Sequence, residues 1–253
     1  MARPVPDWVL TEWFTDVDLG VLKSGKEAEI RVVERSRRDG SGRHLLAQKR
    51  YRPRRVAYKG QLEELGFTRA ATFRNDIGYR EGRAPANSRD RRAVEKMSRH
   101  GKQVVAESWL GQEHDVLRSL WEVGAPVPFP VSFDDHGGLF LEYLGDDQGA
   151  APRLAQARLS PPELRRAWDQ LVEAMFLMVD AGWVHADLSA YNLLWWADRL
   201  WVIDVPQAVD LVGSTQGFEL LHRDVVNVCG WFARHGLEVD AEVVFAELLG
   251  RIG

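Results

Sequence analysis

Three polar side chains spaced around one short apolar run are the strongest candidates for chemistry in this sequence. Asp187 and Asn192 lie five residues apart, and Asp204 follows an apolar run that ends at Ile203. An acid such as Asp187 can accept a proton from a hydroxyl group or from water. An amide oxygen and a second carboxylate can together bind Mg²⁺ on a triphosphate, because this ion prefers oxygen ligands. The order of these residues therefore predicts phosphoryl transfer, which needs mainly positioning and charge neutralisation.

Lys49 and Glu113 fit the same chemistry from an earlier part of the chain. Lys49 lies in a predicted short strand, Leu45–Tyr51, and Glu113 lies in a predicted helix, Val104–Val123. A strand lysine that contacts phosphates and is held by a helical glutamate is the arrangement found in protein kinases. Taken singly, Lys49 reads as an ordinary strand lysine and each acid as a solvated turn residue. The interpretation depends on all of them occurring together and in this order.

The first predicted turn, Lys23–Ala28, offers polar side chains where a glycine-rich loop would offer backbone amides. A loop of the G-x-G-x-x-G type covers phosphates with its amides, but this turn contains only Gly25. Ser24 and Lys26 could supply a hydroxyl and an ammonium group to the phosphates instead. Read alone, the turn is simply polar.

The elements that must position these residues form two lobes of different character. Residues 1–143 are rich in predicted strands with one long helix, and residues 144–253 are mainly helical with one small hairpin. The predicted elements outside those already named are two strands within Gly20–Val33, a strand over Leu139–Leu144, a helix from Ser160 to Gly182, a hairpin around Ala197–Arg199 and helices over Phe218–His235 and Ala241–Leu249. The hairpin separates Asn192 from Asp204, so it brings the two predicted metal ligands together. This pattern predicts an α+β fold.

Charge is unevenly distributed along the chain. Residues 50–102 carry 15 basic and six acidic side chains, a net charge of +9, whereas the whole chain carries −4 and the remainder therefore −13. The second part of this segment, Arg74–Lys102, has little apolar periodicity and reads as a flexible insert with a short helix near its end. The insert is either a solubilising loop or a surface for phosphate-rich partners such as nucleotide or RNA.

Composition indicates a globular protein of a reducing compartment. With 253 residues, 45% apolar and 28% charged, the chain can bury a sizeable core. One cysteine, Cys229, excludes an intrachain disulfide and a cysteine-based zinc site, and we expect a buried thiol there. The start MARPVPDWVL lacks the pattern of a secretory signal, and no apolar run reaches membrane-spanning length. We therefore expect a cytoplasmic protein without a membrane partner.

The sequence resembles the RIO-type atypical serine/threonine protein kinases, most closely in its bacterial-type form. The catalytic loop reads H-A-D-L-S-x-Y-N and the metal loop I-D-V-x-Q-x-V-D, where most protein kinases have H-R-D and D-F-G. The resemblance covers about residues 17–232 and is carried by SGKEA (Ser24–Ala28), AQKRY (Ala47–Tyr51), QEHDVL (Gln112–Leu117), VHADLSAYNLL (Val184–Leu194) and IDVPQAVD (Ile203–Asp210). It implies a two-lobed protein-kinase-like fold with a trimmed C-terminal lobe, lacking an activation segment and peptide-docking helices.

The resemblance also implies a role for each candidate residue. Asp187 would be the catalytic acid/base, and Asn192 and Asp204 would bind Mg²⁺, with Mn²⁺ as an alternative. Lys49, held by Glu113, would contact the α- and β-phosphates of ATP.

The remaining implied roles concern the rest of the nucleotide and the loop that carries the acid/base. Ser24, Gly25 and Lys26 would line the phosphate turn. The hinge Glu142, Tyr143 and Leu144 would bind adenine through its backbone, and Asp224 would brace the catalytic loop.

Departures from the family pattern keep several functions open. Gln48 and Arg50 flank Lys49 where apolar residues are common, and Pro206 stands where serine is common. One function is an ATP- and Mg²⁺-dependent serine/threonine protein kinase that phosphorylates a protein substrate or itself. A second is an ATPase-driven switch that passes phosphate to Asp204 and acts on ribosomal particles or RNA through the basic insert. A third is a small-molecule kinase.

Overall fold

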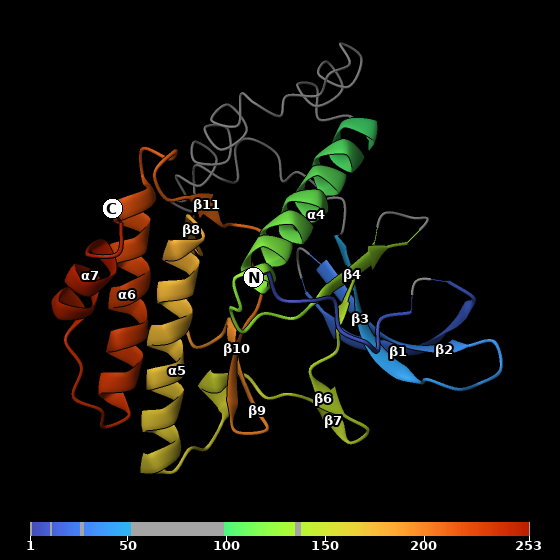
Figure 1. Cartoon of the computed structure of the whole chain (residues 1–253), viewed down its shortest axis with the longest axis horizontal. Coiled ribbons are helices and arrows are strands. Elements are labelled where there is room, and N and C mark those ends of the chain that lie inside the picture. The colour runs from blue at the N-terminus through green and yellow to red at the C-terminus, as the bar shows by residue number, and fades with distance from the viewer. Residues whose placement is uncertain (1, 11, 26–27, 52–98, 135–137, 253) are drawn as a thin grey trace, which may run out of the picture.

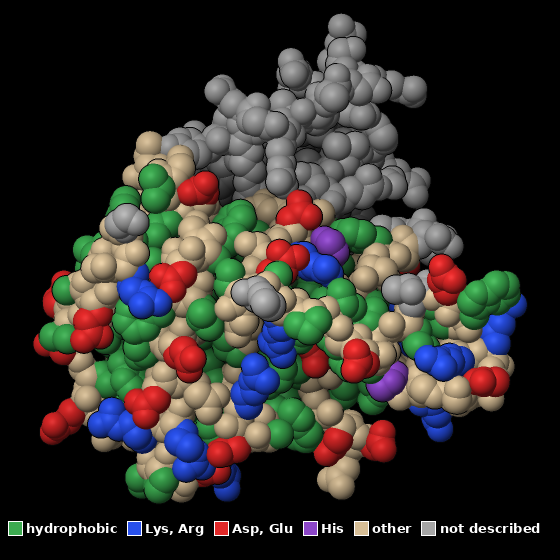
Figure 2. Space-filling view, viewed as in Figure 1, with side chains coloured by type: hydrophobic (Ala, Val, Ile, Leu, Met, Phe, Trp, Pro, Cys, Tyr) green, Lys and Arg blue, Asp and Glu red, His purple; other side chains and the backbone are tan. Residues whose placement is uncertain are grey.

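The computed structural model describes residues 2–10, 12–25, 28–51, 99–134 and 138–252 (Figure 1). Lys26 and residues 74–98 of the predicted insert lie outside this part of the chain. On the face seen in Figure 2, acidic and basic side chains are interspersed with apolar ones. Among the described residues, no helix has both the length and the hydropathy that a bilayer crossing requires.

The N-terminal lobe is built on one antiparallel sheet of five strands, in the order β1-β2-β3-β5-β4. The strands are β1 (Phe14–Ser24), β2 (Ala28–Arg37), β3 (His44–Tyr51), β4 (Pro130–Phe133) and β5 (Leu139–Glu142). The strands predicted in this part of the sequence are confirmed. β1 begins at Phe14, earlier than the predicted Gly20. The earlier start was not predicted because the first residues of this strand are largely exposed and show no apolar alternation.

The polar residues on either side of Lys49 have a structural explanation in the pleat of β3. Successive strand side chains point to opposite faces of a sheet, so Gln48 and Arg50 lie on the face away from Lys49. There both bind Asp134, at the end of β4: Gln48 Nε2 donates to Asp134 Oδ2 at 2.5 Å and Arg50 Nη2 donates to the same oxygen at 3.0 Å. The polar residues Gln48 and Arg50 therefore lie on the face of the sheet opposite Lys49 and do not change the surroundings of the lysine.

One long helix, α4 (Arg99–Glu122), joins the two lobes (Figure 1). It begins before the predicted Val104, so its first residues take up the end of the predicted insert. Its C-terminal half contributes Val116, Leu117 and Leu120 to the core of the C-terminal lobe. Gln112 Nε2 also donates a hydrogen bond of 2.9 Å to the carbonyl oxygen of Ala208, in that lobe.

The C-terminal lobe consists of three helices and short strand pairs (Figure 1). The helices are α5 (Pro161–Asp180), α6 (Gly217–Arg234) and α7 (Ala241–Leu249), and the short elements are β6 (Gly145–Asp146), β7 (Gly149–Ala150), the 3₁₀ helix η2 (Leu154–Gln156), β8 (Trp183–Val184), β9 (Leu193–Trp196), β10 (Arg199–Val202) and β11 (Val209–Asp210). The predicted helices and hairpin are confirmed. Between Asp204 and α6, the structure contains only β11 and turns. The molecule therefore has the predicted α+β, two-lobed protein-kinase-like fold with a trimmed C-terminal lobe.

Local sequence signals fix α5 and the β9–β10 hairpin. Ser160 and Glu163 form a reciprocal capping box at the start of α5. Ala197 and Asp198 form the hairpin turn with φ angles of 50° and 60°, the left-handed conformation that two-residue hairpin turns of type I′ require. Arg166 of α5 holds this turn by an ion pair with Asp198 of 2.7 Å. The helix thus fixes the hairpin that separates the catalytic and metal loops.

Candidate active site

A cavity of about 600 Å³ lies between the two lobes. The sheet contributes Ile30, Ala47 and Lys49 to its walls, and the C-terminal lobe contributes Asp187 and Asp204. The predicted hinge residues also line it: Glu142, Tyr143 and Leu144. Residues far apart in the sequence therefore meet around one space that is large enough for a nucleotide-sized ligand.

Lys49 connects the two lobes through carboxylates. Its Nζ donates to Glu113 Oε1 at 2.5 Å and to Asp204 Oδ1 at 2.7 Å. The Glu113 side chain is 1% exposed and the Asp204 side chain is 45% exposed, so the pair with Asp204 opens onto the cavity. Burial raises the pKa of the Asp204 carboxyl, but nearby positive charge, chiefly the charge and hydrogen bond of Lys49, lowers this pKa by more. Asp204 is therefore held as a carboxylate.

Asn192 is oriented by hydrogen bonds to Asp187. Its Nδ2 donates to the Asp187 carbonyl oxygen at 2.8 Å and to Asp187 Oδ2 at 3.2 Å. The carbonyl oxygen of Asn192 in turn accepts from the N–H of Ile203 at 3.0 Å, next to Asp204. Because the amide nitrogen faces Asp187, the amide oxygen of Asn192 remains for another ligand.

Asp224 of α6 clamps the loop that carries Asp187, as the sequence resemblance implied. Asp224 is 2% exposed and accepts hydrogen bonds from the N–H groups of Ala186 and Leu188, at 2.7 and 3.0 Å. Burial raises the pKa of its carboxyl group. Ala186 has a φ of 62°, in the left-handed region that non-glycine residues rarely adopt. The clamp thus holds the residue before Asp187 in an unfavourable backbone conformation.

His185 links the catalytic loop to the metal loop. Its Nε2 lies 3.1 Å from the carbonyl oxygen of Ile203, and its ring is 1% exposed. Asp204, the residue that follows Ile203, has a φ of 66°. Strained backbone of this kind persists where the surrounding structure fixes it, and it clusters at functional sites. His185 therefore joins the loop that carries Asp187 to the loop that carries Asp204.

The hinge is held by the side chain of one of its own residues. Glu142 Oε2 accepts from the N–H of Phe129 at 3.0 Å, and burial raises the pKa of the Glu142 carboxyl group. Just after the hinge, Gly145 has a φ of 146°, and a Cβ atom there would collide with the carbonyl oxygen of Gly149. Only glycine fits this position, where the β6–β7 turn forms part of the cavity wall through Ala150.

The predicted phosphate turn is only partly described. Gly25 lines the cavity and its N–H donates to the carbonyl oxygen of Ala28 at 2.9 Å. Ser24 is exposed at the end of β1 and is not among the residues that line the cavity. Lys26 lies outside the described residues. Two further cations line the cavity, Lys23 and Arg153, and neither was predicted because no motif marks either of them.

Asn192 and Asp204 fit the donor set that Mg²⁺ requires. One amide oxygen and one carboxylate held in the ionised form provide two oxygen ligands, and nucleotide phosphates complete such a site. The described residues contain no cluster of three or more His, Cys, Asp or Glu side chains arranged to hold a metal. Asn192 and Asp204 therefore fit a metal that arrives with phosphate, which supplies the remaining ligands.

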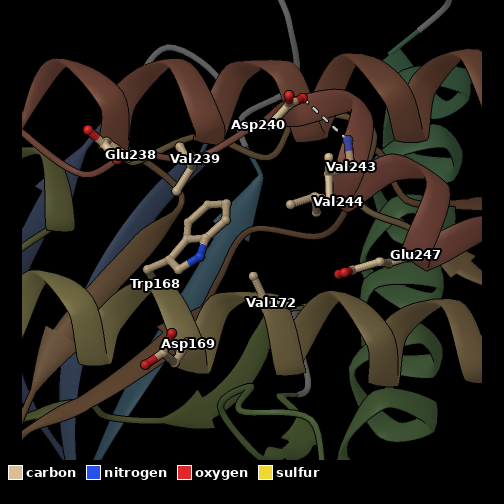
Figure 3. Close-up of a pocket in the computed structure, with 9 residues that line it drawn as sticks. All are labelled: Trp168, Asp169, Val172, Glu238, Val239, Asp240, Val243, Val244 and Glu247. Carbon is tan, nitrogen blue, oxygen red and sulfur yellow. Dashed lines mark hydrogen bonds between the residues drawn. The ribbon is translucent and has the colours of Figure 1, made fainter.

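A second hollow, of about 350 Å³, lies between α5 and α7 and differs in charge (Figure 3). Its floor is apolar and includes Trp168 and Val172. Its polar side chains are all carboxylates: Asp169, Glu238, Asp240 and Glu247. Asp240 caps the start of α7, as the dashed line to the Val243 nitrogen shows. Four carboxylates repel phosphate, so this hollow does not compete with the cleft as a nucleotide site.

Comparison with known proteins identifies the family. Serine/threonine-protein kinase RIO3 of Homo sapiens is 33% identical over 150 residues, which are 59% of this chain and 28% of that protein. RIO-type serine/threonine-protein kinase Rio1 of Thermoplasma acidophilum is 34% identical over 140 residues, 55% of this chain and 72% of that protein. Serine/threonine-protein kinase RIO1 of Caenorhabditis elegans is 30% identical over 221 residues, 87% of this chain and 38% of that protein.

These matches locate the resemblance within larger proteins. This chain spans less than a third of the length of RIO3 and less than half of Caenorhabditis elegans RIO1. Residues 71–244, more than half of the chain, match the family described as RIO domain. That range contains the hinge, the catalytic loop, the metal loop and the clamp from α6. The chain therefore belongs to the RIO domain family.

Proposed function

We propose that this chain binds ATP with Mg²⁺ in the cleft and transfers the terminal phosphoryl group to a serine or threonine hydroxyl, on a protein substrate or on itself. Lys49 carries this proposal, because it binds Glu113 of α4 and Asp204 of the metal loop at the edge of a cavity that Asp187 also lines. The names of the relatives, all serine/threonine-protein kinases, support the same activity.

Each residue of the cleft then has a defined task. Asp187 orients the acceptor hydroxyl and accepts its proton, while Asn192 holds Asp187 in place. Lys49 contacts the phosphates, with Glu113 fixing its position. Asn192 and Asp204 hold Mg²⁺, or Mn²⁺, which neutralises charge on the phosphates when it is bound.

The cleft is formed between an N-terminal lobe, residues 1–143, and a C-terminal lobe, residues 144–253. The backbone of Glu142, Tyr143 and Leu144 binds adenine at their junction, and Ser24, Gly25 and Lys26 form the phosphate turn. This division supplies one wall of the cavity from each lobe, which excludes water once the nucleotide is bound.

The test replaces the proposed acid/base without touching the nucleotide contacts. In Asp187→Ala, we expect phosphoryl transfer to fall about 10²–10⁴-fold, the usual contribution of general acid–base catalysis. ATP affinity should stay within about threefold of the wild type. Asp169→Ala, which removes an exposed carboxylate from α5, is the matched control and should keep full activity. Full phosphoryl transfer by the Asp187 variant would contradict the assignment.

Asp204 favours one alternative, an ATPase-driven switch in which this residue receives the phosphate. Its carboxyl group has a lowered pKa and a side chain that is 45% exposed, so it is an accessible oxygen nucleophile. Phosphosite mapping after incubation with Mg-ATP separates the two activities. An acid-stable phosphate on serine or threonine supports the kinase, and an acyl phosphate on Asp204 supports the switch. Action on RNA or ribosomal particles through the basic insert stays a prediction from the sequence.

A further inference from the structure

Two cationic side chains face the cleft without a partner. Lys23, near the end of β1, and Arg153, just before η2, both line the cavity. Neither side chain makes a hydrogen bond or an ion pair with any residue in the described part of the chain. Two cations of the N-terminal lobe are paired with carboxylates: Arg35 pairs with Asp16 at 2.7 Å and Arg31 with Asp18 at 2.7 Å. What distinguishes Lys23 and Arg153 from other unpaired cations such as Arg158 is that both line one cavity.

The two cations lie close enough to affect each other and the metal loop. Partial burial lowers the pKa of Lys23, and the Arg153 guanidinium lowers it further. The Asp204 carboxylate acts on Lys23 in the opposite direction and raises this pKa. Two unpaired like charges across one cavity repel each other, and an anion placed between them removes this repulsion. The phosphate chain of a nucleotide is such an anion.

The backbone of Arg153 is fixed, although its side chain has no partner. Its carbonyl oxygen accepts hydrogen bonds from the N–H groups of Gln156 and Ala157, at 2.8 and 2.9 Å. Arg153 also forms an isolated bridge with Leu194, at the start of the β9–β10 hairpin. The backbone from which the guanidinium group projects is therefore fixed, so only the side chain loses freedom when it binds a ligand.

We propose that Lys23 and Arg153 form a two-sided phosphate clamp, one cation from each lobe, that binds the polyphosphate chain of the nucleotide. The clamp rests on the proposed function and extends it by two residues. It acts where many kinases have a glycine-rich loop that covers the phosphates, whereas the first turn of this chain contains a single glycine, Gly25. It selects nucleoside di- and triphosphates over the uncharged nucleoside, and bound phosphate draws the two lobes together.

Binding measurements on single variants test the clamp. We expect Lys23→Gln and Arg153→Gln each to weaken ATP and ADP binding about tenfold or more, because each removes a charge-assisted contact. Adenosine binding should be unchanged, and Arg153→Lys should keep part of the affinity. Arg158→Gln is the matched control, since Arg158 is exposed and does not line the cavity. The salt dependence of ATP binding should also become shallower in both glutamine variants.

The outcomes separate the clamp from the proposed function. If the wild type binds ATP and both glutamine variants bind it within twofold of the wild type, the clamp is wrong and the function stands. If the wild type binds neither ATP nor adenosine, inorganic tripolyphosphate is the deciding probe. Binding of tripolyphosphate that both glutamine variants lose would support an anion clamp without nucleotide specificity. No binding of tripolyphosphate by the wild type would overturn the clamp together with the nucleotide site.

Discussion

The cleft and the hollow between α5 and α7 are both partly apolar, yet they are built from different parts of the chain. The cleft collects residues from β1, β3, α4, the hinge and the two loops around the β9–β10 hairpin. The hollow is lined only by α5, α7 and the segment before α7. Cations from both lobes face the cleft, whereas the polar side chains of the hollow are carboxylates.

This difference shows that charge, more than shape, distinguishes the two spaces. The carboxylates of the cleft include Glu113 and Asp204, which are paired with Lys49, so the remaining cations can act on a ligand. Those of the hollow stand at an exposed rim, where Asp240 serves as a helix cap. We therefore expect the carboxylates of the cleft to act in the proposed chemistry, whereas Asp240 in the hollow stabilises the start of a helix. The predictions below test this contrast by removing groups from each side.

The largest effect on stability should come from Lys49→Met. This change leaves Glu113, which is 1% exposed, as a buried carboxylate without its lysine. Breaking a buried ion pair on one side typically costs about 3–5 kcal/mol, and we expect a loss of this size in the free energy of unfolding, measured with urea. Lys49→Met combined with Glu113→Leu should recover most of the loss, because a buried ion pair can be replaced by apolar residues. Equal stability of the single variant and the wild type would show that the pair does not organise the cleft.

A smaller loss is expected from Asp224→Ala, which removes the clamp on the catalytic loop. The N–H groups of Ala186 and Leu188 would lose their acceptor in a buried place, at a cost of about 2 kcal/mol or more. Chemical denaturation measures the loss, and the transfer rate should fall while ATP affinity is kept, since Asp224 does not line the cavity. Asp224→Asn keeps one acceptor oxygen and should be intermediate. A variant with unchanged transfer rate would refute the positioning role.

On the side of the hollow, Asp240→Ala should lower the free energy of unfolding by about 1 kcal/mol through the loss of a helix N-cap. Asp240→Asn keeps the capping oxygen without the charge and should be close to the wild type. Titration calorimetry should give the same ATP affinity for all three proteins. A change in ATP affinity of more than about threefold would mean that the two spaces are coupled.

The smallest effect concerns Cys229, whose pKa reports the electrostatics beside the hollow. Burial, with a smaller contribution from the charge of Asp240, raises the pKa of the Cys229 thiol to about 11. In the folded state the thiol therefore keeps its proton to a higher pH than the ordinary pKa of 9.0 allows. The free energy of unfolding is unaffected by this group below pH 9 and falls as the pH rises towards 11. Thiolate absorbance during a pH titration of the native protein measures this pKa, and Asp240→Asn should lower it. A native thiol that ionises near pH 9 would contradict the buried placement.

Much of the fold could be predicted because its signals are local. Ser160 and Glu163 mark the start of α5 within four residues, and the structure contains that capping box. The alternation of Trp195 and Trp196 in β9 is visible in the sequence, and only Trp195 is buried. The start of α4 at Arg99 was not predicted, because the apolar periodicity of that helix begins only later in the sequence.

The residues of the candidate site that belong to a sequence motif could be predicted. Those that only the tertiary structure brings together could not. Asp187, Asn192 and Asp204 are marked by spacing; Asp187 and Asp204 line the cleft, and Asn192 is hydrogen-bonded to Asp187. Lys23 and Arg153 are 130 residues apart, and nothing in their neighbours distinguishes them from other surface cations. Their shared position depends on how two lobes meet, which no local pattern encodes. The same holds for Asp134, which pairs with Gln48 and Arg50 from another strand of the sheet.

The position of α4 has a consequence for how such an enzyme could be regulated. In many protein kinases, activity is controlled by moving the helix that carries the glutamate partner of the strand lysine. Here that helix is anchored twice, because Leu117 and Leu120 lie in the core of the C-terminal lobe and Gln112 is bonded to Ala208. Moving Glu113 away from Lys49 would pull apolar side chains out of that core. We therefore expect the catalytic arrangement to be permanently assembled, so that control falls to the supply of nucleotide and to access of the acceptor.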